Sequence, residues 1–412
     1  MNIFSIIVLA LIFARTGMQF WLEKLNQRHV LAHADKVPEA FQSVIDEPAY
    51  KKSVAYTLAK SKFQQIELAF DTVLLLVVLF SKVLPWFYNT FQQQFGTSVW
   101  AGAAFLFAAG ILLSIGGLPF AWYSQFRLED RFGFNTTTPK VWWLDRAKGL
   151  LLALILGYPL LVLILKLVQW TVDLWWLFAF ACVLGFQLLM MVLAPILILP
   201  LFNKFTPLPD GTLRERLLAL GKKTGFHAKS IQVMDGSRRS RHSNAFFTGF
   251  KRFRKIVLFD TLIEQLTEPE LEAVLAHEIG HYQKKHIPKM LLWSAATLFM
   301  TFYFISVLAR QNWFYEAFGF QNNDIVIALF LFSLLSGVVT FWFSPVAHWW
   351  SRKHEYEADR YAAEATGQPA WIISALRKLN EKNLSNLTPH PLYSGFYYSH
   401  PTHLEREKAL AA

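Results

Sequence analysis

The chain has 412 residues, of which 54% are hydrophobic, 16% aromatic and only 17% charged. Soluble domains carry about 25% charged residues, and the apolar residues here gather in long uncharged runs, so the composition excludes an ordinary soluble protein. The net charge of +11 is high enough for a nucleic-acid binder, but basic loops in a membrane protein mark its cytoplasmic face, and we expect no nucleic-acid partner.

Seven apolar runs along the chain are near the length that a bilayer requires. They lie at about 2–22, 67–87, 99–122, 149–169, 174–202, 290–309 and 325–347. The first has no basic residue before Ile6 and no clear small-residue cleavage site, so we expect an uncleaved anchor rather than a signal peptide. We therefore predict an all-α polytopic membrane protein, with a five-helix membrane domain at 1–203 and the last two spans inside a second domain at 204–412.

The loops between these spans differ in charge in an alternating way. The segments after the first, third, fifth and seventh spans are rich in Lys and Arg, whereas the other loops hold only Lys82, Lys166 and Arg310. Because cytoplasmic loops carry the basic excess, this alternation predicts an N-terminus outside and a C-terminus in the cytoplasm. It also places the polar segment 204–288 in the cytoplasm.

This polar segment is the one sizeable soluble piece that the sequence predicts. Its pattern indicates an amphipathic helix at 213–223, strands at 231–234 and 255–259, and a further strand within 243–250. We therefore expect a small α+β unit on the cytoplasmic side of the membrane helices.

The end of this segment contains the motif His277-Glu278-Ile279-Gly280-His281. Residues four apart share a face of an α-helix, so the two imidazoles can converge on one metal ion. Glu278 lies beside them and can take a proton from water, which is the arrangement of a zinc-dependent peptidase. The flanking residues read as one helix from Leu271 to His286. A solvated helix with incidental histidines is the alternative for this motif taken alone.

A third ligand is required, and the single cysteine, Cys182, lies in an apolar run, so that ligand must be a histidine or a carboxylate. Glu355 and Asp359 follow the last span and share a helical face, so one can bind the metal while the other orients a ligating imidazole. His354 is a competitor that spacing does not exclude, whereas Glu357 projects from a different face. A charged helix beside the membrane is the alternative for this segment.

Several stretches, in this order and spacing, resemble one family over nearly the whole chain. They are Val37-Pro38-Glu39 with the following 47–56 stretch, Glu129 to Asn135, Asp235 to Gly249, the HEIGH motif, Glu355 to Asp359, and Ser399-His400-Pro401. Together they are similar to the type I CaaX prenyl proteases, integral-membrane zinc metallopeptidases that also process yeast mating pheromone. The resemblance implies seven helices around a chamber, capped by a zinc-metallopeptidase domain on the cytoplasmic side.

The resemblance also implies roles for individual residues. One Zn²⁺ per chain would be bound by His277, His281 and Glu355, with Glu278 as the catalytic base. Asp359 would support a ligand histidine, and Arg406 would anchor the site electrostatically.

The substrate would be laid as an extended strand along Asn244, Ala245 and Phe246. His400, from the Ser-His-Pro motif, would stabilise the tetrahedral oxyanion. His286 receives no role.

The activity implied is removal of the C-terminal tripeptide of prenylated CaaX proteins, from a peptide or protein that is prenylated or membrane-inserted. A quality-control protease that degrades damaged membrane proteins is the alternative within the enzyme class. A metal-binding scaffold or transporter is the alternative from another class. It is disfavoured because most spans lack mid-depth charges and because Glu278 is not needed to bind metal. Short loops and no retention signal after Leu410 favour a bacterial inner membrane over the endoplasmic reticulum.

Overall fold

The computed structural model describes residues 2–226, 229–248 and 255–411. Within them, seven helical segments are long and apolar enough to cross a membrane, which confirms the predicted number of spans. They are Ile3–Ala32, Glu47–Phe80, Val99–Phe132, Pro139–Thr171, Trp175–Phe202, His286–Leu308 and Ile325–Thr366.

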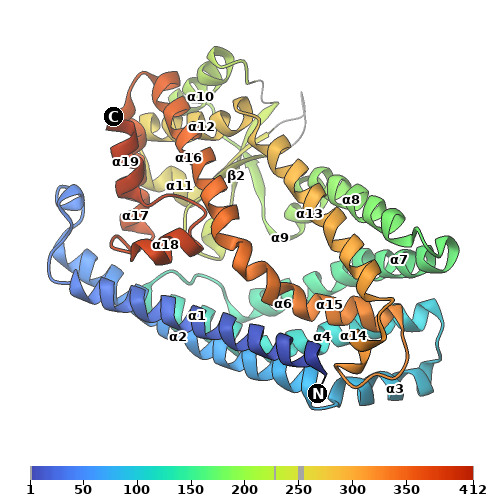
Figure 1. Cartoon of the computed structure of the whole chain (residues 1–412). Helices are drawn as coiled ribbons and strands as arrows, with labels where there is room; N and C mark the ends of the chain where they lie inside the picture. The colour runs from blue at the N-terminus through green and yellow to red at the C-terminus, as the bar shows by residue number, and fades with distance from the viewer. Residues whose placement is uncertain (1, 227–228, 249–254, 412) are drawn as a thin grey trace.

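Several of these helices run well beyond their apolar cores. Helix α2 (Glu47–Phe80) has 34 residues, so it is about 51 Å long at 1.5 Å per residue, whereas the hydrocarbon core of a bilayer is about 30 Å thick. Helix α1 (Ile3–Ala32) packs against α2, and the two lie side by side along the lower edge of Figure 1. Their polar ends therefore continue out of the apolar layer toward the soluble part.

The third, fourth and fifth spans each contain a π-helical turn. These turns are η2 (Ser124–Glu129), η3 (Ala153–Gly157) and η4 (Ala194–Ile198). They join α4 (Val99–Tyr123) to α5 (Asp130–Phe132), α6 (Pro139–Leu152) to α7 (Tyr158–Thr171), and α8 (Trp175–Leu193) to α9 (Leu199–Phe202). Two further helices, α3 (Val83–Phe95) and α14 (Asn312–Glu316), connect spans and were not predicted.

The soluble part is built on a four-stranded sheet of order β1-β2-β4-β3. The strands are β1 (Phe205–Pro207), β2 (Ser230–Met234), β3 (Ala245–Thr248) and β4 (Lys255–Phe259). β2 and β4 are parallel, and β3 is antiparallel to β4, with Phe246 opposite Val257. The strands predicted at 231–234 and 255–259 are confirmed, as is the one within 243–250, of which residues 249–250 lie outside the described part. β3 is an edge strand of this sheet.

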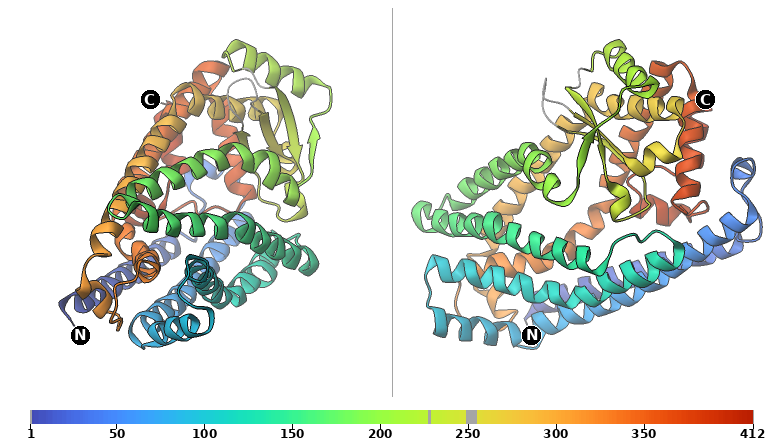
Figure 2. Two further views of the ribbon diagram at one scale, coloured as in Figure 1. Left: turned by 90° about the vertical axis from the view of Figure 1, so that its right-hand side faces the viewer. Right: turned by 180° about the vertical axis from the view of Figure 1, so that it is seen from behind.

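Helices surround the sheet and form one apolar core with it. They are α10 (Thr212–Lys223), α11 (Asp260–Gln265), α12 (Glu268–Gln283), α16 (Ser344–Thr366), α17 (Pro369–Lys382) and α19 (His403–Ala411). Leu258, Ala276 and Ile372 are at most 2% exposed in this core. Helix α18 (Pro391–Tyr397) packs in a separate apolar cluster with Leu22 of α1. Figure 2 shows the sheet and these helices above the long membrane helices, with α13 (His286–Leu308) leading down from them. Helix α15 (Ile325–Thr340) lies among the membrane helices, against α1, α4 and α13.

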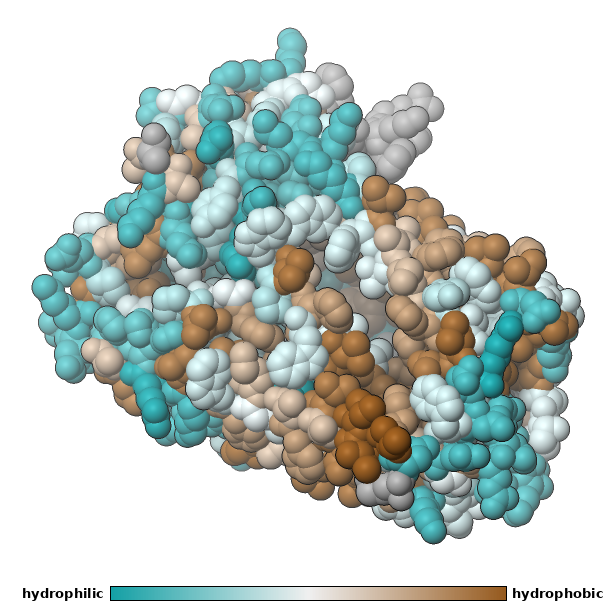
Figure 3. All heavy atoms as spheres, viewed as in Figure 1, coloured by the Kyte–Doolittle hydropathy of each residue, from teal (hydrophilic) through white to brown (hydrophobic). Residues whose placement is uncertain are grey.

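The distribution of hydrophobic and hydrophilic residues on the surface follows the division into a membrane part and a soluble part. On the face shown in Figure 3, hydrophilic residues gather over the part that holds the sheet, and hydrophobic residues form a broad region below it. Many exposed large apolar side chains belong to the membrane helices, among them Trp170, Leu197 and Leu292. This fold is the predicted class, a helical membrane protein with a small α+β domain.

Candidate metal centre

Helix α12 carries the two histidines and is fixed at its start by a capping box. Thr267 is the N-cap, and Glu270 accepts a hydrogen bond from the Thr267 backbone N–H at 2.8 Å. The Glu270 carboxylate also accepts from Lys378 (2.8 Å) and Ser374 (2.6 Å) on α17. Because these bonds satisfy donors at the helix start and join it to α17, the position of α12 is set independently of any metal.

Helix α12 crosses α16 at very close range, and Gly280 makes this possible. A Cβ at Gly280 would lie 3.0 Å from the Ala358 Cα and 3.1 Å from the Ala358 carbonyl oxygen. Only a residue without a side chain lets the two backbones approach so closely. The crossing brings Glu355, one turn before Ala358, opposite the histidines of α12.

The three predicted metal ligands converge at this crossing. Nε2 of His277 and Nε2 of His281 lie 3.1 Å apart. Each is 3.4 Å from a Glu355 carboxylate oxygen. One ligand atom from each residue lies within 4.8 Å of the others. Two imidazoles and one carboxylate form the His₂Glu donor set of catalytic zinc sites, which leaves a coordination position for water.

The surroundings of Glu355 fit a bound cation. Its side chain is 6% exposed, and its Oε2 atom is buried with no hydrogen-bond partner. A buried carboxylate oxygen without a partner is costly. A cation held between Glu355 and the two Nε2 atoms would satisfy it, so the residues present fit a divalent metal with nitrogen and oxygen ligands.

Asp359 and Arg406 form a chain of hydrogen bonds that ends at Nδ1 of His277, the ring nitrogen that does not face Glu355. Nδ1 of His277 lies 2.8 Å from Asp359 Oδ1, and Arg406 Nε donates to Asp359 Oδ2 at 2.7 Å. Burial disfavours a charge on His277, but the hydrogen bond to Asp359 and the Glu355 carboxylate 3.4 Å from its Nε2 outweigh burial and raise its pKa to about 9. Burial and the neighbouring His277 lower the pKa of His281 to about 4. A metal must therefore displace a proton from His277 to bind there.

His286 occupies a position that the sequence did not predict. Helix α12 ends at Gln283, not beyond His286, because Lys285 adopts a left-handed conformation (φ 57°) and a new helix begins at His286. The turn folds His286 back, so its Nδ1 lies 2.9 Å from Nδ1 of His281. Its Nε2 lies 3.0 Å from Glu357 Oε2. Both histidines of the motif thus have a partner on Nδ1, which leaves Nε2 for the metal.

His354, left open as a third ligand, lies elsewhere. Its ring stacks on that of His286, with centroids 4.1 Å apart, and it is not among the residues whose donor atoms converge. Glu357 pairs with His286 rather than with the metal ligands. Glu355 and Asp359 are thus the residues of this helix that lie at the predicted metal centre, and His354 packs beside it.

Glu278 and His400 border the same centre. Glu278 is largely buried, and burial together with the nearby Glu355 raises the pKa of its carboxyl group despite the opposing influence of His277. Nε2 of His400 lies 3.5 Å from Glu355 Oε1, and 64% of the His400 side chain is exposed. Of these two residues, His400 lines the open side of the predicted ligands, and Glu278 lies in their buried surroundings.

The predicted substrate strand is the edge of the sheet beside α12. Ala245 and Phe246 lie in β3, and Asn244 precedes it, accepting a hydrogen bond from the Phe259 N–H through its backbone carbonyl (3.1 Å). In the described part of the chain, β3 pairs only with β4, so its other edge has no strand partner. An extended peptide can add to such an edge through main-chain hydrogen bonds.

This chain is similar to known proteins along nearly its whole length. Residues 26–204 match the family model "CAAX prenyl protease N-terminal, five membrane helices", and residues 207–412 match "Peptidase family M48". The CAAX prenyl protease 1 of Saccharomyces cerevisiae is 36% identical over 403 residues, covering 91% of this chain and 88% of that protein.

Two further relatives extend this similarity. The human CAAX prenyl protease 1 homolog is 30% identical over 436 residues, covering 93% of this chain and 90% of that protein. The crystal structure of S. mikatae Ste24p superposes with a TM-score of 0.91 at 35% identity and covers 100% of this chain and 99% of that one. The fold is thus shared with the Ste24p structure, and the sequence similarity extends over both the membrane part and the peptidase part of the chain.

Proposed function

This chain belongs to the CAAX prenyl protease family, a membrane metallopeptidase family, and from that premise we propose that it cleaves prenylated CaaX carboxyl termini with one zinc ion per chain. The observation that carries the proposal is the convergence of His277, His281 and Glu355, together with the buried, unpartnered oxygen of Glu355. The names of the relatives support the substrate class.

The metal would be held by the Nε2 atoms of His277 and His281 and by the Glu355 carboxylate. A zinc ion bound there would polarise the scissile carbonyl and lower the pKa of water toward neutrality. Asp359 fixes the orientation of His277 through Nδ1, and Arg406 holds Asp359 in its charged form by a two-point contact. The ligands would therefore be held in place before substrate arrives.

Glu278 and His400 would carry the proton and charge transfers. The raised pKa of Glu278 makes its carboxylate a stronger base, suited to take the proton of the attacking water and return it to the leaving amine. His400, on the open side, would donate a hydrogen bond to the oxyanion that forms on the scissile carbonyl. The edge of β3 at Asn244, Ala245 and Phe246 would hold the substrate backbone.

The site would open on the cytoplasmic side. This orientation rests on the basic loops that follow the odd-numbered spans, since such loops face the cytoplasm. A prenylated carboxyl terminus on the cytoplasmic face would then reach the site without crossing the bilayer.

The proposal is tested by proteolysis with purified protein in detergent. A farnesylated CaaX peptide is compared with its unlipidated twin, each with wild type, with Glu278→Gln, and after chelation followed by zinc add-back. We expect zinc-dependent cleavage of the farnesylated peptide by wild type only, and retention of metal by Glu278→Gln.

Other outcomes would change the assignment in defined ways. Equal cleavage of the two peptides would keep the peptidase chemistry but replace the prenyl specificity with that of a broader membrane protease. Cleavage by Glu278→Gln at the wild-type rate would exclude Glu278 as the base. A zinc-loaded wild type that cleaves neither peptide would overturn the proposed activity.

A further inference from the structure

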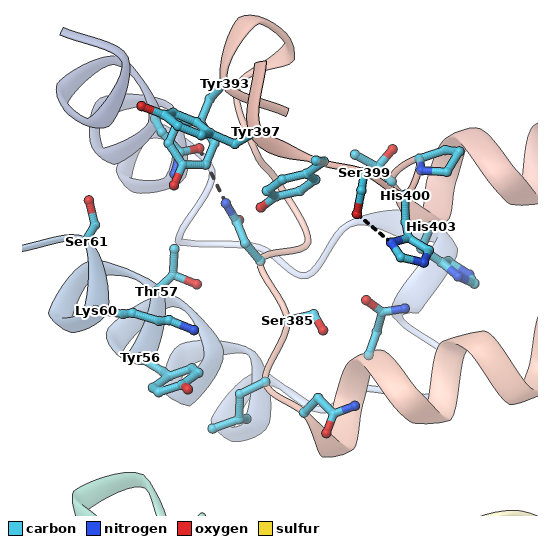
Figure 4. Close-up of a pocket in the computed structure, with 18 of the residues that line it drawn as sticks. Tyr56, Thr57, Lys60, Ser61, Ser385, Tyr393, Tyr397, Ser399, His400 and His403 are labelled. Carbon is cyan, nitrogen blue, oxygen red and sulfur yellow. Dashed lines mark hydrogen bonds between the residues drawn. The ribbon is translucent and has the colours of Figure 1, made fainter. Parts of the chain in front are cut away.

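A large polar cavity begins at the open side of the metal centre. Its volume is about 570 Å³, within the range of sites that enclose small ligands. Figure 4 shows Tyr56, Thr57, Lys60 and Ser61 on the α2 wall, with Ser399 and His400 across the cavity. One end of this cavity thus lies at a residue beside the metal ligands and the other at a membrane helix.

We propose that this cavity binds the carboxyl-terminal peptide that cleavage releases, and that Lys60 recognises its free α-carboxylate. The inference rests on the proposed function and adds a specificity-determining residue to it.

The charge of the cavity suits a carboxylate. No Asp or Glu lines it in the part of the chain that the structure describes. Two of its cationic or titratable residues are already paired: Arg406 with Asp359, and His403 Nε2 with Glu407 Oε2 at 3.1 Å.

Lys60 differs from them. Its side chain is exposed, its ammonium lies 5.6 Å from the centroid of the Tyr56 ring, and it forms no ion pair with any described residue. The Glu129 carboxylate lies beyond ion-pair distance of Lys60, although the charge of Lys60 helps to lower the Glu129 pKa, and it accepts a hydrogen bond from the Tyr56 hydroxyl at 2.7 Å. Lys60 thus offers three N–H donors and a full charge to a ligand in the cavity.

The direction of the substrate follows from the sheet. Antiparallel strand pairs outnumber parallel ones two- to threefold, so a peptide added to the free edge of β3 is expected to run opposite to it. Its carboxyl end then passes the amino end of β3, at Ala245 and Asn244. His242, two residues earlier, lines the cavity. The segment after the scissile bond is therefore directed into the cavity that contains Lys60.

The wall between these points is suited to peptide backbone. It carries the amide side chains of Asn380, Asn383 and Asn386, which can both donate and accept hydrogen bonds. Three extended residues span about 10 Å, and the cavity volume accommodates such a segment. A short peptide ending in a free carboxylate fits this combination of amides and one unpaired ammonium.

The test uses two farnesylated peptides of one sequence, one with a free carboxyl terminus and one with a terminal amide. We expect wild type to show kcat/KM about tenfold higher for the acid, as one charge-assisted hydrogen bond can provide. Lys60→Gln should lose that preference by slowing the acid alone, and Lys60→Arg should retain most of it. Lys62→Gln, on the same helix outside this cavity, is the matched control and should behave as wild type.

Two results would overturn the inference while leaving the proposed function intact. One is a wild type that cleaves acid and amide equally well. The other is a Lys60→Gln variant that slows both peptides by the same factor, since this indicates a structural role. Failure of wild type to cleave either peptide would instead reject the proposed function, and the role of Lys60 with it.

Discussion

Nδ1 of His277 and Oδ1 of Asp359 lie 2.8 Å apart where α12 crosses α16. The Asp359 side chain is 2% exposed, so this bond forms almost without competition from water. It fixes the imidazole ring so that Nε2 points to Glu355, and it joins the helix that supplies two predicted ligands to the helix that supplies the third. Folding of the domain and assembly of the metal site therefore depend on the same contact.

Replacing Asp359 should weaken metal binding more than any single change outside the ligands. In Asp359→Ala, His277 loses its acceptor and Arg406 is left as a buried charge without its partner. We expect zinc affinity to fall 10- to 100-fold and stability to fall by about 3 kcal/mol. Competition with a chromophoric chelator measures the first, and thermal unfolding in detergent the second.

The conservative variant separates these two effects. Asp359→Asn keeps an acceptor for His277 but removes the charge opposite Arg406, so it should bind zinc more tightly than Asp359→Ala while remaining destabilised. Zinc affinity of Asp359→Ala equal to that of wild type would contradict the role assigned to this bond.

His286 should affect zinc affinity through its hydrogen bond with His281. With Nδ1–H of His281 donating to His286, and Nε2–H of His286 donating to Glu357, the chain of bonds fixes the tautomer in which His281 Nε2 is free. His286→Ala should lower zinc affinity about tenfold, the low end of such effects. His354→Phe is the control, because it alters the stacking partner of His286 and no bond to His281. Equal affinities for the His286 variant and this control would refute the prediction.

The spans and the central motif were predictable because each depends on local pattern. The apolar runs needed only length and composition, and the spacing of His277 and His281 needed only the helical repeat. Glu355 and Asp359 could be placed on one helical face by the same reasoning. The choice of Glu355 as ligand came from the family resemblance, since spacing alone left His354 open.

The role of His286 could not be predicted from its position in the sequence. Helical periodicity continued past Gln283, and nothing in the local pattern marks Lys285 as a residue with positive φ, a conformation uncommon for residues other than glycine. The contact between His286 and His281 instead depends on the turn at Lys285. Lys60 is a similar case, because only the packing of a membrane helix against residues 385–406 makes its side chain part of a cavity.

Gly280 should be intolerant of even one methyl group. A Cβ there would meet the Ala358 backbone at 3.0 Å and the Tyr361 Cβ at 3.1 Å, so Gly280→Ala must separate α12 from α16. We expect a loss of about 1–3 kcal/mol in stability and weaker zinc binding, because Glu355 moves away from both histidines. Gly185→Ala, in α8 with open space around the added Cβ, should be neutral. Unchanged zinc affinity in Gly280→Ala would argue against the close crossing.

The carboxylate of Glu270, which caps α12, should make the stability of the protein depend on pH in the acid range. Burial alone would raise the pKa of Glu270, but its bonds with Lys378, Ser374 and Thr267 lower the pKa below the usual 4.5. A depressed pKa in the folded state means that the ionised group stabilises the protein above about pH 4.5, and that this contribution disappears as pH falls through the folded-state pKa. Since Lys378 is one-third exposed, we expect a modest contribution of about 1–2 kcal/mol.

Glu270→Gln should therefore unfold at a lower temperature than wild type by a constant interval between pH 6 and 8, and the interval should shrink below pH 4.5. Thermal unfolding in a nonionic detergent, followed by tryptophan fluorescence at each pH, measures it. Glu264→Gln, an exposed acid on the neighbouring α11, controls for the loss of one negative charge and should track wild type throughout. An interval for Glu270→Gln that stays constant into acid would contradict the electrostatic role, because a protonated carboxyl group and a neutral amide are alike in charge and nearly alike in size.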